Sequence, residues 1–284
     1  MINKKYKDRL FCLLFGNEEY KDNILSLYNA LCNTSYTNTD DIQIYTIEDV
    51  IYIKMKNDVS ILLDSFLYLW EQQSTFNPNM PIRGLLYFGK MYDKYITENH
   101  LNIYGKTLIK LPTPKYTVLY NGMDEQPAFM QLRLSDSFIN PDSSGDFEWT
   151  ANMINLNDGK NDDLLDKCRP LKEYMALISE IRKNSVSMGF EDAVDTAVTY
   201  CIEHNVLKSF LLKHRAEVLD VCITEYNEKS FVDGIREEGR KEGRKEGQNL
   251  LATVVLRLRN GETPEQILAS GVDAKTIELA ETIK

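Results

Sequence analysis

Residues 57–73, NDVSILLDSFLYLWEQQ, decide the fold that we expect for this chain. Two runs rich in aliphatic and aromatic residues, at 58–63 and 66–75, flank the dipeptide Asp64-Ser65. Runs of this length and composition are typical of strands, and Asp and Ser favour tight turns. The stretch therefore predicts a β-hairpin that turns at Asp64-Ser65.

The hairpin brings acidic residues together. Counted outward from the turn, Leu63 pairs with Phe66, and Asp58 then falls opposite Glu71. Gln73 lies on the same face as Glu71, because alternate residues of a strand share a face. Facing carboxylates repel each other, but a divalent cation reverses the sign of that interaction. The spacing is thus that of a metal site for phosphodiester hydrolysis; the alternative is that both acids are solvated at strand ends, with Asp58 in a turn.

The first 160 residues alternate between helical and strand patterns. Apolar residues recur at helical spacing in some segments and alternate with polar ones in others. We expect helices at 6–15, 20–32 and 82–98, the last opened by Pro81, and further strands at 42–47, 50–54, 115–122, 130–135 and 147–156. This mixture predicts an α/β fold, with a mixed sheet flanked by helices.

The second half of the chain carries helical patterns and no strand pattern. We expect helices at 161–184, 190–204, 206–215 and 216–230. The domains that we predict are a core at 1–160, a helical region at 161–234 that packs on the core, a charged helical linker at 235–249 and a small helical tail at 250–284.

The linker repeats the unit EEGR-KEGR-KEGQ. Glycine at every fourth position costs about 1 kcal/mol relative to alanine, so this helix is weak alone. It is either a spacer or one of a close-packed pair of helices. In the tail, Thr263 and Asp273 are placed to cap two short helices that resemble a helix-turn-helix. The alternative is a tail that docks or dimerises, and we expect a homo-oligomer through it.

Composition limits the function. The chain has 284 residues and a net charge of −10, which argues against a surface coated in basic residues for non-specific DNA binding but leaves room for a local basic groove. Five scattered cysteines without a CxxC pair and three histidines indicate neither a zinc site nor a disulfide framework. No apolar run approaches the roughly 20 residues of a membrane span. We therefore expect a soluble, cytoplasmic protein.

The residues of 56–92, KNDVSILLDSFLYLWEQQSTFNPNMPIRGLLYFGKMY, resemble the Rpn-type family of PD-(D/E)XK nucleases, which are recombination-promoting and transposase-like proteins. The segments LPTPKYTVLYNG (111–122), LKHRAEVLDVCITEYNE (212–228) and EEGRKEGRKEG (237–247) are similar to the firmicute branch of that family. The resemblance covers nearly the whole chain. It implies a restriction-endonuclease-like core at 1–160.

The resemblance also assigns roles to the acidic hairpin. It implies that Asp58 and Glu71 hold a divalent ion, Mg²⁺ or Mn²⁺. Gln73 stands where the family usually has a lysine that positions or activates the attacking water. An amide has neither a basic group nor a positive charge, but it orients a water by hydrogen bonding. The catalytic set that follows is Asp58, Glu71 and Gln73.

A further candidate is Arg83, at the start of the helix after NPNMP, where a guanidinium would reach a scissile phosphate in bidentate geometry. The alternative is a surface arginine that pairs with Asp93 or Glu98. Taken together, these features predict a Mg²⁺-dependent endodeoxyribonuclease that acts on double-stranded DNA in recombination or mobile-element biology. The alternative is a catalytically impaired, nuclease-derived module for DNA binding or assembly.

Overall fold

A computed structural model describes residues 6–45, 59–142, 144–222, 251, 253–270 and 272–283. The chain divides into two compact units, Met1–Glu225 and Tyr226–Lys284, and each is described by itself. Three of the expected features lie outside the described residues: the strand at 50–54, the repeats at 235–249 and Asp58.

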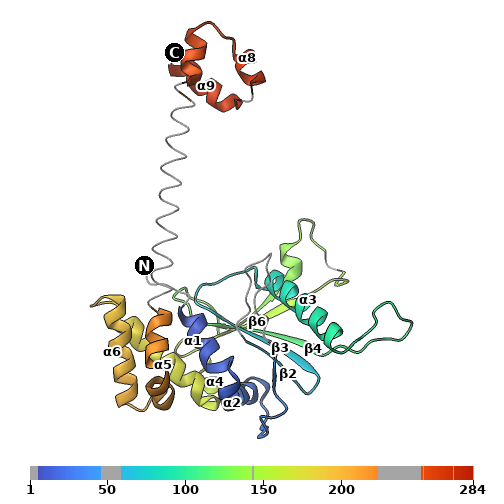
Figure 1. The fold of residues 1–284 in the computed structure, drawn as a ribbon, viewed down its shortest axis with the longest axis vertical. Helices are drawn as coiled ribbons and strands as arrows, with labels where there is room; N and C mark the ends of the chain where they lie inside the picture. Colours follow the sequence, from blue (N-terminus) through green and yellow to red (C-terminus); the bar gives the residue numbers. More distant parts are fainter. Residues whose placement is uncertain are drawn as a thin grey trace. The chain divides into compact units, whose positions relative to one another are not determined.

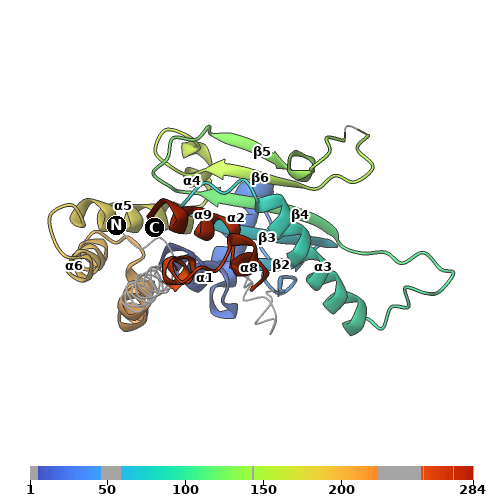
Figure 2. The ribbon, with the colours of Figure 1, turned by 90° about the horizontal axis from the view of Figure 1, so that it is seen from above.

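The first unit is an α/β structure built on one six-stranded mixed sheet (Figure 1). Its strands are β1 (Gln43–Ile44), β2 (Val59–Leu63), β3 (Phe66–Gln73), β4 (Thr113–Tyr120), β5 (Phe129–Arg133) and β6 (Thr150–Asn155). They lie in the order β1-β2-β3-β4-β6-β5, so that β1 and β5 form the edges. Figure 2 shows the part of this order from β2 to β5. β3 pairs with β4 and β4 with β6 in parallel, and the other neighbours are antiparallel. The α/β prediction is confirmed.

The β2–β3 hairpin has the predicted turn and register. Leu63 pairs with Phe66, and the ladder continues to Val59 opposite Trp70. Asp64 and Ser65 both have positive φ, 49° and 64°. Two successive residues with positive φ form the kind of turn whose twist matches that of the flanking strands. The predicted pairing is therefore present along the whole of β2, from Leu63 back to Val59, where the described residues begin.

Helices cover both faces of the sheet (Figure 1). One face packs against helices from the two ends of the unit, which are α1 (Tyr6–Phe15), α2 (Lys21–Cys32), α4 (Asp162–Lys167), α5 (Arg169–Asn184), α6 (Phe190–Glu203) and the described helical residues 208–222. The other face packs against α3 (Met80–Glu98), which has a proline in its first turn as expected. Because β3 and β4 are parallel, α3 is the crossover between them.

Two predictions in the helical half were wrong in detail. The segment 161–184 is divided at Cys168, because Pro170 lacks the N–H that would continue one helix and instead lies in the first turn of α5. The expected division between 206–215 and 216–230 is absent, since the described residues 208–222 form one continuous helix. The sequence Arg-Ala-Glu at 215–217 contains good helix formers and no breaking residue.

The second unit has described helices at 251–259, with residue 252 left out, α8 (Pro264–Ala269) and α9 (Ala274–Ile283). Both predicted caps are present: Thr263 forms a capping box with Gln266, and Asp273 accepts a hydrogen bond from the N–H of Thr276 at 3.0 Å. Within the described ranges, no helix is both long and apolar enough to cross a bilayer.

Glu148, two residues before β6, connects this strand to the end of β5 through hydrogen bonds and an ion pair. This carboxylate accepts hydrogen bonds from the Ser135 hydroxyl at 2.7 Å and from the backbone N–H groups of Ser135 and Trp149, and it pairs with Arg133 at 3.1 Å. These donors, with the Ser135 hydroxyl first, lower the pKa of Glu148 to about 2. Donors that favour the charged form stabilise the fold only while the carboxylate is ionised.

We therefore expect the Glu148→Gln substitution to give a pH-dependent loss of stability. The difference in free energy of unfolding between wild type and variant should be fully present above the ordinary pKa of 4.5 and should vanish as pH falls toward about 2. Urea unfolding at a series of pH values between 7 and 3 measures it. A difference that stays constant over that range would contradict this role of Glu148.

Candidate functional site

Glu71 is a fully buried carboxylate in the centre of the sheet. It lies near the end of β3, on the strand face whose other members, Leu67 and Leu69, pack against α3. Trp70 belongs to the core on the opposite face. The strand alternation therefore directs Glu71, and with it the half-buried Gln73, toward α3.

Both carboxylate oxygens of Glu71 have partners. The hydroxyl of Tyr116, on the neighbouring strand β4, donates to Oε2 at 2.8 Å. On the other side, Nη2 of Arg83 lies 3.3 Å from Oε1 and forms an ion pair with it. Because an unpaired buried charge is strongly unfavourable, these two partners are what the buried Glu71 requires.

Arg83 reaches Glu71 from the first turns of α3. Its Nη2 also donates to the hydroxyl of Tyr87 at 3.2 Å, and its Nη1 to the sulfur of Met80 at 3.6 Å. Its ion pair is thus with Glu71, and the expected alternative partner Glu98 instead accepts a hydrogen bond from Tyr45 at 2.7 Å. Arg83 keeps 29% of its side chain exposed, whereas Glu71 has none.

The electrostatics of Glu71 reflect this enclosure. Burial raises its pKa, and the charge of Arg83 together with hydrogen bonds from Tyr116 and Tyr87 opposes that rise. The pKa of Tyr116 is also raised well above its usual range, first by burial and then by the neighbouring carboxylate. A phenol that keeps its proton is the form that donates to Glu71. The cluster formed by Glu71, Arg83, Tyr87 and Tyr116 is called the Glu71 cluster below.

A close approach between α3 and β4 sets the geometry of the Glu71 cluster. A Cβ atom added at Gly84 would lie 2.4 Å from Cε1 of Tyr116 and 2.9 Å from Nε1 of Trp149. Only a residue without a side chain fits there. Gly84 therefore lets the helix lie directly on the ring whose hydroxyl holds Glu71, beside the residue that carries the guanidinium.

The described residues do not by themselves fit a divalent metal ion. No three His, Cys, Asp or Glu side chains lie together among them in a way that would hold a cation. Glu71 offers the hard oxygens that Mg²⁺ prefers, but Arg83 and Tyr116 occupy both of them. Asp58, the second carboxylate that the sequence predicts, lies outside the described residues. Gln73 is on the expected face, and its backbone carbonyl accepts from the N–H of Asn121 at 3.0 Å.

A polar network that the sequence patterns did not predict lies on the opposite face of the same strand end. Asn121, fully buried, accepts from Nε2 of Gln72 at 2.8 Å and from Nζ of Lys7 at 3.4 Å. Its carbonyl accepts from Arg182, on α5. The Asn121-Gly122 dipeptide reads as a turn signal, which hides the fact that Asn121 joins β3, α1 and α5.

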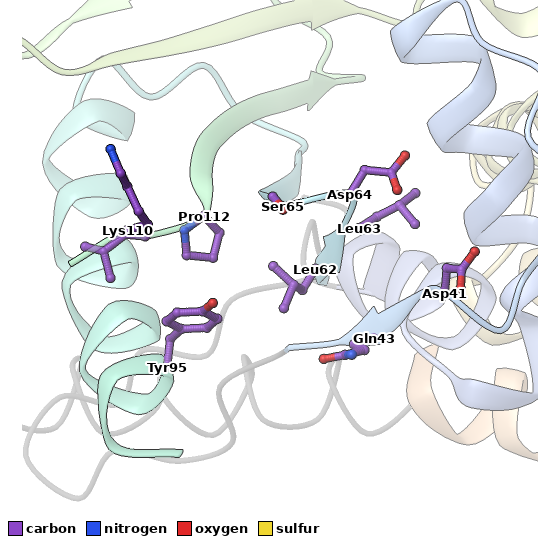
Figure 3. A pocket seen from close by; sticks show the side chains of 10 residues that line it. Asp41, Gln43, Leu62, Leu63, Asp64, Ser65, Tyr95, Lys110 and Pro112 are labelled. Carbon is purple, nitrogen blue, oxygen red and sulfur yellow. The ribbon is translucent and has the colours of Figure 1, made fainter. Parts of the chain in front are cut away.

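A cavity of about 270 Å³ lies at the other end of the hairpin. Figure 3 shows Tyr95 and Pro112 on one side of it and Asp41 and Gln43 on the other. Leu62 and Ser65 also line it, which places it at the turn where β3 begins. Glu71 lies near the end of β3, so the cavity is separate from the Glu71 cluster.

Comparisons with protein-family models, with curated proteins and with solved structures found no match to this chain.

The packing at Gly84 predicts opposite effects for two glycines of the same helix. Gly84→Ala should lower the free energy of unfolding by about 1–3 kcal/mol, because the new methyl group must displace Tyr116 or the helix. Gly89→Ala, where nothing lies within 4 Å, should raise it by up to about 1 kcal/mol through helix propensity. Urea unfolding of both variants tests this, and a Gly84→Ala variant as stable as wild type or more stable would contradict the close packing of α3 on Tyr116 at Gly84.

Proposed function

We propose that this chain is an endodeoxyribonuclease that hydrolyses phosphodiester bonds of double-stranded DNA, with a restriction-endonuclease-like arrangement of its mixed sheet. The observation that carries the proposal is the Glu71 cluster: a wholly buried carboxylate beside a guanidinium, on the strand face predicted for a catalytic acid. The hairpin register supports it, since the ladder runs as predicted from Leu63–Phe66 to Val59–Trp70.

Each side chain of the site would have its own role in the proposed reaction. Asp58 and Glu71 would be the carboxylate ligands of Mg²⁺ or Mn²⁺, as the resemblance to Rpn-type nucleases implies. Such an ion supplies charge neutralisation and a more acidic bound water at a phosphodiester. Tyr116 and Arg83 hold Glu71 in position, and Arg83 has the exposure needed to contact a phosphate. Gln73 would orient a water through its carboxamide.

The proposed reaction is the hydrolysis of a phosphodiester, and water is its only co-reactant. Water adds across one P–O bond of the backbone, which leaves a phosphate monoester on one fragment and a hydroxyl on the other. The charge that builds up on phosphorus and on the departing oxygen must be stabilised, and positioned cations are the usual means. In this chain Arg83 is the cationic side chain of the Glu71 cluster. DNA recombination or mobile-element activity is the biological setting that we propose for such a cut.

The second candidate is a catalytically impaired, nuclease-derived module that binds DNA or assembles with further copies. The enclosure of Glu71 favours it, because both oxygens are occupied and none of the side chain is exposed. Gln73 favours it as well, since an amide is not a base near neutral pH. The two candidates differ in whether the chain cuts DNA at all.

Plasmid nicking with Mg²⁺ or Mn²⁺ separates the candidates. For a nuclease, Asp58→Asn and Glu71→Gln should each lower the nicking rate by about 100-fold or more, because each removes several kcal/mol of transition-state stabilisation. These substitutions keep side-chain volume. In Glu71→Gln the amide oxygen still accepts from Tyr116, but the amide nitrogen then faces Arg83, so nicking is compared only for variants shown to be folded. The matched control is Glu148→Gln, which alters a carboxylate that pairs with Arg133 outside the Glu71 cluster and should leave nicking unchanged.

Equal nicking by wild type and by both site variants would remove the catalytic assignment. Gel-shift binding of the same plasmid without cleavage, unaffected by either substitution, would favour the impaired module. Circular dichroism of each variant confirms that lost nicking is not lost folding.

A further inference from the structure

The segment between α3 and β4, residues 99–112, projects from the rest of the first unit (Figures 1 and 2). It leaves the end of α3 and returns beside the same helix, where the hydroxyl of Tyr92 donates to the carbonyl of Pro112 at 2.8 Å. A turn orders its tip, because the N–H of Tyr104 donates to Oδ1 of Asn102 at 3.0 Å. The segment is therefore an arm with a defined base and tip, and it is called the 99–112 arm below.

The 99–112 arm exposes large apolar side chains. Tyr104 has 92% of its surface exposed, Leu108 has 77% and Ile103 has 56%. Single exposed apolar residues are common on protein surfaces, but a group of them on one projection is typical of an interaction site. The arm thus has the composition of a surface that contacts another molecule.

Charge also distinguishes this part of the chain. No acidic residue lies between Glu98 and Asp124, although the whole chain has 43 acidic residues and a net charge of −10. The same interval contains Lys106, Lys110 and Lys115, and all three are exposed. An acidic surface repels a polyanion, which approaches where positive charge is gathered. The arm is therefore a place where a polyanion can contact this acidic protein.

We propose that the 99–112 arm is a binding element for double-stranded DNA: Lys106 and Lys110 contact backbone phosphates, and the apolar tip around Tyr104 lies in a groove of the duplex. Lysine binds phosphate as a point charge, and proteins that enter the minor groove often place apolar side chains against base steps. This inference rests on the DNA binding that both candidate functions share, and it requires no metal ion.

The position of the arm fits one duplex that also reaches the Glu71 cluster. Arg83 lies in the first turns of α3, and the arm begins where this helix ends, at Glu98. At 1.5 Å per residue, the helix between these two residues spans roughly 22 Å. Phosphates of one DNA strand follow each other every 3.4 Å or so along the duplex axis, and the span thus equals roughly six to seven base pairs. A duplex that follows α3 would meet both the arm and the exposed part of Arg83.

The test is the fluorescence anisotropy of a labelled DNA duplex titrated with the full chain in EDTA, over a series of KCl concentrations. EDTA removes divalent ions, so binding is measured apart from cleavage. In Lys106→Gln combined with Lys110→Gln, the plot of log binding constant against log KCl concentration should become shallower by about 1.8, since each phosphate contact contributes about 0.9. Affinity at low salt should fall about tenfold or more with the loss of these two contacts.

A second variant tests the apolar tip. Tyr104→Ala should weaken binding by about tenfold and leave the salt dependence unchanged, because it removes an uncharged contact. The matched control is Lys167→Gln combined with Lys208→Gln, which should bind DNA as wild type does. These two lysines are exposed, hydrogen-bond to asparagine side chains and lie on helices that cover the other face of the sheet. All the substituted side chains are exposed, and circular dichroism checks that each variant is folded.

The outcomes separate the arm from the nuclease proposal. If wild type binds the duplex and the arm variants bind it with the same affinity and salt dependence, the arm is overturned, and nicking that depends on Glu71 would leave the nuclease intact. If the arm variants lose affinity as expected but no form of the chain cuts DNA, the arm stands and the catalytic assignment falls.

Two further results would overturn the arm as a DNA-binding element. One is a wild-type chain that does not bind the duplex even at low salt. The other is binding to vesicles of anionic phosphatidylglycerol that depends on Lys106 and Lys110 and is not matched by binding to DNA, which would assign the arm to a lipid surface.

Discussion

The carboxylate of Glu71 is the constraint on which the central part of the structure depends. A charge inside a sheet is tolerated only when its neighbours compensate it. The chain supplies that compensation from two directions, a phenol on β4 and a guanidinium on α3. The parallel crossover from β3 through α3 to β4 brings both of them to the same carboxylate, and Gly84 allows the helix to come near enough.

The two faces of the sheet are organised differently around β3. The α3 face contains the charged Glu71 cluster, whereas the opposite face contains the amide network of Asn121 and Gln72, next to the apolar core formed by the other helices. Glu71 and Gln72 are adjacent at the end of β3, but they belong to two separate polar groups. Glu71 is part of the Glu71 cluster, and Gln72 is part of the network around Asn121. The WEQQ sequence of β3 is therefore polar on both sides of the sheet.

Local patterns predicted the hairpin, α3 and the caps of the second unit, because each is encoded by neighbours in the sequence. Turn residues, strand alternation and Pro81 suffice for the first two, and Thr263 and Asp273 for the caps. The partners of Glu71 were not predicted, since nothing local shows that Arg83 points back across the helix–sheet interface. The role of Asn121 was hidden for the same reason: its contacts with Lys7 and Arg182 are distant in sequence.

That difference in sequence distance has a consequence for the order of folding. The contacts of Glu71 with Arg83 and Tyr116 span 12 and 45 residues, whereas those of Lys7 with Asn121 and Tyr174 span 114 and 167. Loop-closure entropy rises with the logarithm of loop length, so the longest of these contacts costs roughly 2 kcal/mol more to close than the shortest. The β3–α3–β4 crossover is thus the part of the first unit best placed to form early, and the helices from the two ends of that unit would then pack onto a sheet that already holds its buried charge.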